Sequence, residues 1–333
     1  MAVSMHDVAR AAGVSVRTVS NVVNNFAYVR PETRRRVLEA MEELGYVPNA
    51  AARSLRRSRT GLIALVVPDF RARIFADLAG PVVREAEALG HRVLIEVTDS
   101  DRERELQVLM GGRNQLTDGA IMMALSLRPE DGRRRRPGYP LVLMGDHVLE
   151  GDIHHVAIPN REASLAVVRH LVSTGRRRLM LLGHGPHGSE TASMRLRGFL
   201  DGLAEAGLPA DEALMVAADW SRARGRQAIE EHIDSGRPLP DAIFAMNDSL
   251  AFGALRALRE HGVLVPQEVA LVGFDDVEEA RYSTPSLTSV SPDLEAMAAH
   301  AVAMLHEQII GKPSGREPHI TVDFHLRVRE SSQ

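Results

Sequence analysis

The sequence predicts an α + α/β protein with an N-terminal three-helix helix-turn-helix domain, a hinge helix and two doubly wound α/β lobes. Three observations predict it. Two short helical patterns flank Gly13, strand-like apolar runs alternate with helical segments from Gly61 onward, and this alternation restarts after residue 158. Such alternation is typical of parallel sheets covered by helices on both faces, and the restart indicates a second lobe.

The first two helices are short and close together. Residues 7–12 carry an apolar helical face, which ends at Gly13. Ser15 is a suitable N-cap for a second helix, in which valines recur at helical spacing from residue 16 to residue 23. This pattern is typical of a helix-turn-helix, whose second helix enters the major groove of DNA.

A third helix is predicted from Pro31, a residue favoured at the first helical position, to Gly45. Its apolar face is expected to complete the small core. That face consists of Val37, Leu38, Met41 and Leu44. The run of Arg34, Arg35 and Arg36 is expected to be mostly a solvated face, and a phosphate contact by one of them stays open.

The N-terminal segment is basic and the remainder is acidic. Residues 1–60 hold ten arginines and five acidic residues, a net charge of +5, whereas the whole chain carries −4 and the remainder −9. A basic segment ahead of an acidic body is typical of a small nucleic-acid-binding module. A preference for arginine over lysine explains the residue type, but it does not explain the change of sign at residue 60.

The second helix carries the groups that could read bases. Arg17 can bind guanine and Asn21 can bind adenine, each through two hydrogen bonds. Thr18 and Ser20 are better suited to phosphate contacts or to local capping.

A short basic segment follows the third helix. Asn49 can cap a helix from Ala50 to Arg56, which is too short to be stable alone in water. Leu55 on such a helix is suited to wedge into the minor groove and kink the duplex. From chemistry alone, a flexible basic linker is an equally good interpretation.

The motifs DVARAAGVS, TVSNVVN and PETRRRVLEAMEELGYVPNAAARSL resemble the LacI/GalR family of bacterial transcription regulators, and the resemblance covers essentially the whole chain. It implies that Val16, Arg17 and Asn21 read an operator half-site, that Leu55 intercalates and that Ala52 packs near a dimer axis. The full set of expected DNA-binding residues is Ser15, Val16, Arg17, Thr18, Ser20, Asn21, Asn49, Ala52, Arg53, Leu55 and Arg56.

Two positions depart from the family pattern in this part of the chain. Many members carry arginine where this chain has Asn21, so its operator is expected to deviate from the commonest half-site. Arg30 replaces the usual serine cap before Pro31.

The resemblance implies a body of the periplasmic-binding-protein type, with a cleft between its lobes. We expect the helix-turn-helix domain at residues 1–47, the hinge helix at 48–59 and an effector-binding and dimerisation domain at 60–333. Its first lobe is expected at about 60–158 and 290–318, and its second at about 159–289 and 319–333, with three crossings near residues 158, 289 and 319.

Polar and aromatic side chains at strand ends are candidates for the cleft, because ligands of open parallel sheets bind there. The expected effector-binding residues are Phe75, Arg195, Trp220, Asn247 and Asp275. A lone tryptophan suits stacking on a sugar or base, and Asp, Asn and Arg suit hydroxyl contacts. Taken alone, a capping role is favoured over effector contact for Asn247-Asp248 and Asp275-Asp276. The family resemblance favours Arg195, Asn247 and Asp275 as effector contacts.

The first-lobe half of the cleft departs from the family. The aspartate common in sugar-responsive members aligns with Gly145, with Asp146 one residue late, and the crossover Asp-Asn pair is Pro159-Asn160. A solvent-facing position is favoured for Arg71 and Arg73 over contact with an acidic effector.

Several function classes are disfavoured. The chain has no cysteine, and its histidine pairs lack a third ligand at a suitable spacing, so no metal site is expected. No phosphate loop, dinucleotide fingerprint or nucleophile elbow is present, so no cofactor and no catalytic residue is expected. No secretory signal or membrane-spanning run is found, and the expected location is the cytoplasm.

The sequence therefore predicts a homodimeric, effector-responsive regulator, in the first place a repressor, that binds a pseudo-palindromic operator. Its effector is expected to be a sugar, polyol or nucleoside. The alternatives are a cytoplasmic small-molecule-binding protein and a two-lobed α/β enzyme, both without operator specificity. Whether the effector induces or co-represses is left open.

Overall fold

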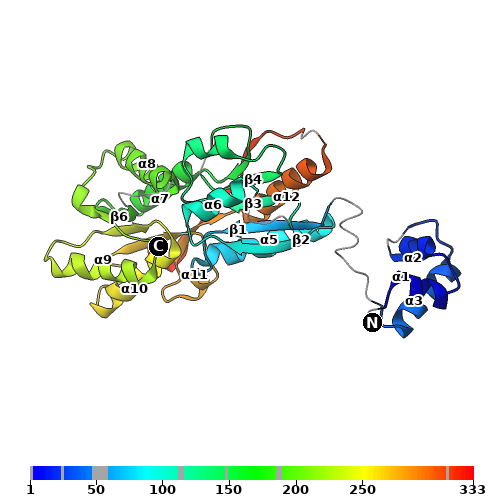
Figure 1. Cartoon of the computed structure of the whole chain (residues 1–333). Coiled ribbons are helices and arrows are strands. Elements are labelled where there is room, and N and C mark those ends of the chain that lie inside the picture. The colour runs from blue at the N-terminus through cyan, green and yellow to red at the C-terminus, as the bar shows by residue number, and fades with distance from the viewer. Residues whose placement is uncertain are drawn as a thin grey trace. The chain divides into compact units, whose positions relative to one another are not determined.

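The structure is a computed structural model that describes residues 3–23, 26–46, 59–111, 116–146, 149–184, 190–312 and 315–333. It divides into two compact units, Met1–Thr60 and Gly61–Gln333 (Figure 1). None of the described helices is long and apolar enough to cross a membrane.

The N-terminal unit contains three helices, α1 (Met5–Ala11), α2 (Val16–Val23) and α3 (Pro31–Glu43). Ser4 caps α1 through a reciprocal pair of hydrogen bonds with Asp7. Gly13 adopts a φ of 63°, which lets the chain turn between α1 and α2. The core of this unit consists of Val8, Ala9, Ala12, Val19, Val22, Val37 and Ala40.

The expected apolar face of α3 is corrected in part. Val37 is buried as expected, but Leu38 is 50% exposed and Leu44 is 36% exposed, and Ala40 completes the buried face of the helix. Arg36 donates from Nη2 to the carbonyl oxygens of Ala12 (2.7 Å) and Gly13 (3.3 Å). The last carbonyls of a helix lack partners within it, so Arg36, which is exposed as expected, also caps the end of α1.

Arg34 is also tied to the protein. It donates from Nη2 to the carbonyl oxygen of Phe26 at 2.8 Å, just beyond α2. Arg35 and Arg36 are exposed, as expected, and Arg35 pairs with Glu39 on the same helix at 2.9 Å. Two of the three consecutive arginines therefore fasten the turns of the three-helix unit.

The second unit begins with a six-stranded parallel sheet in the order β11-β5-β4-β3-β1-β2. Its strands are β1 (Leu62–Val67), β2 (Arg92–Val97), β3 (Ala120–Met123), β4 (Leu141–Met144), β5 (His154–Ala157) and β11 (His319–Thr321). Alternate residues of β1 pack against α5 (Arg73–Ala88) and α6 (Arg102–Leu109), and α12 (Leu294–Ile310) packs on β3, β4 and β5. This sheet and its helices form the first lobe.

The second lobe is built on a sheet in the order β12-β10-β9-β8-β6-β7, in which only β12 is antiparallel to its neighbour. Its strands are β6 (Leu179–His184), β7 (Met215–Ala217), β8 (Ala242–Ala245), β9 (Ala270–Phe274), β10 (Thr288–Pro292) and β12 (Phe324–Arg327). Its helices are α7 (Asn160–Ser173), α8 (Glu190–Glu205), α9 (Arg222–Asp234), α10 (Asp248–Glu260) and the short α11 (Glu279–Tyr282). The α7–α8 and α9–α10 pairs flank the sheet (Figure 1).

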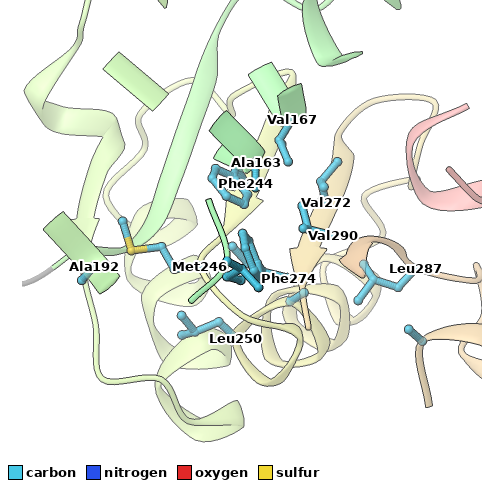
Figure 2. Close-up of a cluster of buried hydrophobic side chains, with 14 of the residues drawn as sticks. Ala163, Val167, Ala192, Phe244, Met246, Leu250, Val272, Phe274, Leu287 and Val290 are labelled. Carbon is cyan, nitrogen blue, oxygen red and sulfur yellow. The ribbon is translucent and has the colours of Figure 1, made fainter. Parts of the chain in front are cut away.

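The core of the second lobe extends to the carboxyl ends of its central strands. Figure 2 shows Phe244, Met246 and Phe274 together in it, close to Val290. All four side chains are fully buried. The segments that follow β8 and β9 therefore begin at fully buried, packed positions.

The two lobes are joined by three crossings of the chain. The first follows β5, near residue 158 as expected. Because β10 belongs to the second sheet and β11 to the first, the other two crossings come after Pro292 and after Thr321, a few residues later than expected. The sequence patterns also missed β5, β10, β11, β12 and α12 as elements.

Candidate functional site

The second helix of the N-terminal unit presents polar groups beside a buried face. Val19 and Val22 pack into the core, while Arg17 is exposed and Asn21, one turn later, is half-buried. Residues four apart share one helix face, so Arg17 and Asn21 lie together. Val16 and Ser20 are half-buried on the same helix.

The start of this helix is capped as expected. Ser15 accepts a hydrogen bond at Oγ from the backbone nitrogen of Thr18 at 3.1 Å, and the two hydroxyls lie 2.9 Å apart. Local capping, one of the two roles considered for Thr18, is therefore present in the structure. The expected hinge-helix contacts Asn49, Ala52, Arg53, Leu55 and Arg56 lie outside the described residues.

The second unit contains a cavity of about 1190 Å³ between its two lobes. It is lined by residues that follow the carboxyl ends of strands in both sheets, as expected for open parallel sheets. The five side chains expected at the cleft all line it: Phe75, Arg195, Trp220, Asn247 and Asp275.

Arg195 on α8 is buried and held from several sides. Its Nε donates to Asn160 Oδ1 at 2.7 Å, and its Nη1 donates to the carbonyl oxygen of Met246. The guanidinium lies 3.4 Å from the ring centroid of Phe274 and 5.1 Å from that of Trp220. Burial lowers the pKa of Arg195, while nearby carboxylates, Asp275 first, oppose this shift. Arg195 is thus a fixed positive group in the wall of the cavity.

Asp275 follows β9, and its carboxylate makes a long ion-pair contact with Arg195. Its side chain is 12% exposed, and Arg195 Nη2 lies 4.0 Å from its Oδ1. Burial raises the pKa of Asp275 to about 7, with Arg195 lowering it and Asp77 raising it. A buried acceptor with a strongly shifted pKa in a cleft is a frequent mark of a binding site.

Asn247 and Trp220 serve both the fold and the cavity. Asn247 caps α10 by accepting from the backbone nitrogen of Leu250 at 2.8 Å, and its Nδ2 donates to the carbonyl oxygen of Trp220 at 3.2 Å. Trp220 in turn donates from Nε1 to the carbonyl oxygen of Gly183 at 2.9 Å. Its polar atom is occupied, which leaves the indole ring for stacking.

The first lobe contributes a mainly apolar wall. We call first-lobe wall the apolar group of Ile74, Phe75, Leu78, Met123, Met144, Leu294 and Met297. We call second-lobe wall the polar group of Arg195, Asn247, Asp275 and Trp220. Phe75, which was expected to contact the effector, is 9% exposed and belongs to the apolar side.

The acidic residues on the first-lobe side are engaged by protein groups. Asp146, 4% exposed, accepts two hydrogen bonds from Asn160 Nδ2 (2.9 and 2.8 Å) and one from Thr191 Oγ1 (2.5 Å). Asp69 accepts from the backbone nitrogens of Arg71 (2.6 Å) and Ala72 (3.1 Å). Asp146 was not chosen from the sequence as a site residue, although its position two residues after the end of β4 could have indicated it.

Two arginines of the first lobe, Arg71 and Arg73, are exposed. Arg71 lines the cavity with a side chain that is 87% exposed, and Arg73 is paired with Asp77 at 2.7 Å, in line with their expected solvent-facing positions.

Asp248 is completely buried beside the cavity, and burial raises its pKa well above the usual value. Within the described residues, no cluster of three or more His, Cys, Asp or Glu could hold a metal ion.

Comparison with known proteins assigns the chain to a family. Residues 4–49 match the bacterial regulatory proteins of the lacI family, and residues 168–332 match the periplasmic binding protein-like domain. The chain is 36% identical over 334 residues to the HTH-type transcriptional regulator CelR of Thermobifida fusca, covering 97% of this chain and 96% of CelR. The chain belongs to the LacI family. The prediction of a DNA-binding transcription regulator is therefore confirmed.

Solved structures of the family agree with the fold. A CelR–cellobiose complex superposes with a TM-score of 0.71 at 32% identity, covering 99% of each chain. The lac repressor dimer bound to operator and the anti-inducer ONPF gives a TM-score of 0.86 at 27% identity, covering 100% of this chain and 99% of the repressor. The relatives matched along their length are transcription regulators. The alternative of a two-lobed α/β enzyme is therefore rejected for this LacI-family chain.

Proposed function

We propose that the chain is an effector-responsive repressor that binds a pseudo-palindromic operator as a homodimer, and that a sugar-like molecule in the cleft sets its operator affinity. It acts in the cytoplasm, where operator DNA lies. One observation carries the proposal: five side chains chosen from strand ends in the sequence line one cavity between two parallel sheets.

The chemistry of the cavity supports a ligand with several hydroxyl groups. The Asp275 carboxylate can accept hydrogen bonds from hydroxyls, and Arg195 and Asn247 can orient them. The ring of Trp220 offers an apolar face for stacking. A relative, CelR, has been solved in complex with cellobiose, which supports the sugar class for this chain.

The position of the cavity supports coupling to DNA. A ligand that touches both walls favours the lobe arrangement in which both contacts are made. A change in that arrangement alters operator affinity, with a coupling expected at about 1–3 kcal/mol and equal in both directions. Whether the ligand weakens or strengthens DNA binding depends on the arrangement that it favours.

The DNA side of the proposal rests on α2. In a dimer, two copies of α2 enter successive major grooves, with Val16, Arg17 and Asn21 at base edges. The solved lac repressor dimer on its operator supports this arrangement. The hinge contacts through Leu55 stay a prediction from the sequence.

Selection from a pool of random duplexes, followed by fluorescence anisotropy, tests operator binding. Arg17→Ala should lower the affinity for the selected duplex by about ten- to a hundredfold, as is typical for the loss of a bidentate base contact. Arg35→Ala is the matched control, because Arg35 is an exposed arginine of the same unit that pairs with Glu39. Enrichment of no duplex over bulk DNA would contradict the proposal.

A thermal-shift panel of sugars, polyols, nucleosides and sugar phosphates tests the effector class. A ligand that binds only the native state raises its apparent stability by mass action. We expect at least one hydroxyl-rich compound to stabilise the wild-type protein and to change its operator affinity. A panel in which only compounds without hydroxyl groups bind would reject the sugar-like class.

A further inference from the structure

The last residues of the chain fold back onto the strand that follows the Asp275 turn. After β12, a short helical turn (Glu330–Ser332) places Ser331 and Ser332 in fully buried positions. Ser331 Oγ donates to the carbonyl oxygen of Leu271 on β9 at 2.5 Å and accepts from the backbone nitrogen of Thr288 at 2.8 Å. The C-terminal segment is therefore packed against β9 and β10.

Arg329 at the start of this segment reaches the turn directly. Its Nη2 donates to Asp276 Oδ1 at 2.6 Å, and its Nη1 donates to the carbonyl oxygen of Leu287 at 2.7 Å. Its backbone nitrogen also donates to Thr288 Oγ1 at 2.8 Å. The Arg329 side chain is 16% exposed and that of Asp276 is 3% exposed. This ion pair is shielded from solvent, unlike surface pairs that contribute little.

The turn needs such support because its backbone is unusual. Asp275 has a φ of 112° and Asp276 a φ of 50°, both in the region that L side chains rarely adopt. Such residues persist only where their surroundings hold them. Here the backbone nitrogen of Asp275 donates to the carbonyl oxygen of Val290 at 2.8 Å, and that of Asp276 donates to Ser289 Oγ at 3.0 Å.

A second buried carboxylate holds the far side of the turn. Asp248 accepts from Ser289 Oγ at 2.6 Å and from the backbone nitrogen of Val277 at 2.9 Å. The backbone on both sides of Asp276 is thus fixed from β10 and α10. Within the described residues, Arg329 is the group that bonds the Asp276 side chain itself.

We propose that Arg329 is a positioning residue for effector binding: it holds Asp276 from the C-terminal segment and so keeps the neighbouring Asp275 carboxylate in the wall of the cavity. This inference rests on the proposed function, in which Asp275 contacts the effector. It assigns the final residues of the chain a role in the ligand site, although they do not line the cavity.

The test measures how the thermal stability of the protein depends on the charge of Asp275, without any ligand or DNA. The charged groups around this carboxylate are Arg195 on α8, Asp248 on α10 and Asp77 on α5. Because burial raises the pKa of Asp275 above its unfolded value, ionising it at high pH destabilises the folded protein. Asp275→Asn should therefore raise the Tm more at pH 8 than at pH 5.5, by about 4 °C or more.

The same substitution is then made in an Arg329→Met background. If Arg329 holds the turn, its loss lets the Asp275 carboxylate reach solvent. The additional rise in Tm that Asp275→Asn gives at pH 8 compared with pH 5.5 should then fall to less than half. A purely structural role would lower the Tm of both forms equally and leave that gain unchanged, which would overturn the proposal. Arg327→Met, which changes an exposed arginine on β12, is the matched control and should preserve the full gain.

Two further variants keep the test decisive. Arg329→Lys should restore part of the pH-dependent gain, because an ammonium group can pair with Asp276 but cannot also hold Leu287. If Arg329→Met does not fold, Asp276→Asn removes the charge of the pair and should reduce the gain in the same direction. Since neither effector nor operator is used, a failed effector screen would contradict the proposed function without affecting this result.

Discussion

The two walls of the cleft are built in the same way and differ in chemistry. Both stand at the carboxyl ends of parallel strands, where ligands bind in this type of fold. The second-lobe wall presents Asp275 and Arg195, whereas the first-lobe wall presents side chains such as Phe75, Met123 and Met144. Architecture therefore decides where a ligand binds, and the side chains decide which part of it faces each lobe.

The acidic residues near the two walls also differ in their hydrogen-bond partners. Asp146 and Asp69 are bonded by neighbouring protein groups, whereas the ion pair that Asp275 makes within the described part of the chain is with Arg195 at 4.0 Å. A hydroxyl desolvated against an apolar wall without a partner costs about 1–3 kcal/mol. We therefore expect ligand hydroxyls to face the second lobe and apolar ligand surface to face the first.

Removing the charge on the second-lobe wall should have the largest effect. Asp275→Asn should weaken binding of the best ligand of the panel by about ten- to a hundredfold, since hydrogen bonds to charged groups contribute about 1.5–3 kcal/mol. Titration calorimetry measures the change. Asp69→Asn, an acid on the first-lobe side that already caps its own loop, should change binding less than threefold. Equal losses in both variants would refute the difference between the walls.

Arg195→Lys should lower both stability and ligand affinity. A lysine cannot replace the bonds to Asn160 and Met246 together, so about 1–3 kcal/mol of stability should be lost. Thermal unfolding measures this loss. The matched change Arg71→Lys, on the exposed side of the cavity, should leave the Tm unchanged. A stable Arg195→Lys variant with normal binding would show that the guanidinium network is dispensable.

Ligand affinity should also depend on pH through Asp275. Its pKa of about 7 means that the carboxyl is largely protonated at pH 6 and largely ionised at pH 8. Hydroxyl donors need the ionised acceptor, so affinity should rise by up to about tenfold from pH 6 to pH 8. Calorimetry across this range should give a flat profile for Asp275→Asn. A flat profile in the wild-type protein would contradict the proposed contact.

The smallest expected effect concerns the first-lobe wall. For any sugar that binds, its phenyl glycoside should bind at least about threefold more tightly than a disaccharide of similar size, because burying apolar surface contributes about 25 cal/mol per Å². Cellobiose and phenyl β-D-glucoside form one such pair. Met123→Gln should remove the preference, whereas Leu264→Gln, an exposed leucine elsewhere, should keep it. A preference for the disaccharide would show that the first-lobe wall also binds hydroxyls.

Local patterns predicted the alternating elements and the strand ends well. The strand-end rule placed Asn247 and Asp275 at the cavity because their positions follow from short runs of apolar residues. It could not predict bonds between distant segments. Arg329 meets Asp276 across 53 positions, and Asp146 meets Thr191 across 45 positions.

Elements without a clear period were also missed. β10 and β12 are short and contain no apolar run, and they pair with each other only after the chain has crossed between lobes twice. Leu38 was expected in the core together with Val37, but neighbouring residues of a helix point in different directions, and only Val37 of the two is buried. Arg36 is exposed as expected, but its bond to the carbonyl oxygen of Ala12 was not predicted, because it joins residues 24 positions apart.

Operator binding by the wild-type protein and by Asp275→Asn, each measured by anisotropy with and without the best ligand, tests the central claim most directly. We predict that the ligand changes wild-type operator affinity by about fivefold or more, whereas the variant binds the operator equally well and does not respond. An Asp275→Asn variant with an unchanged dose response would contradict the account.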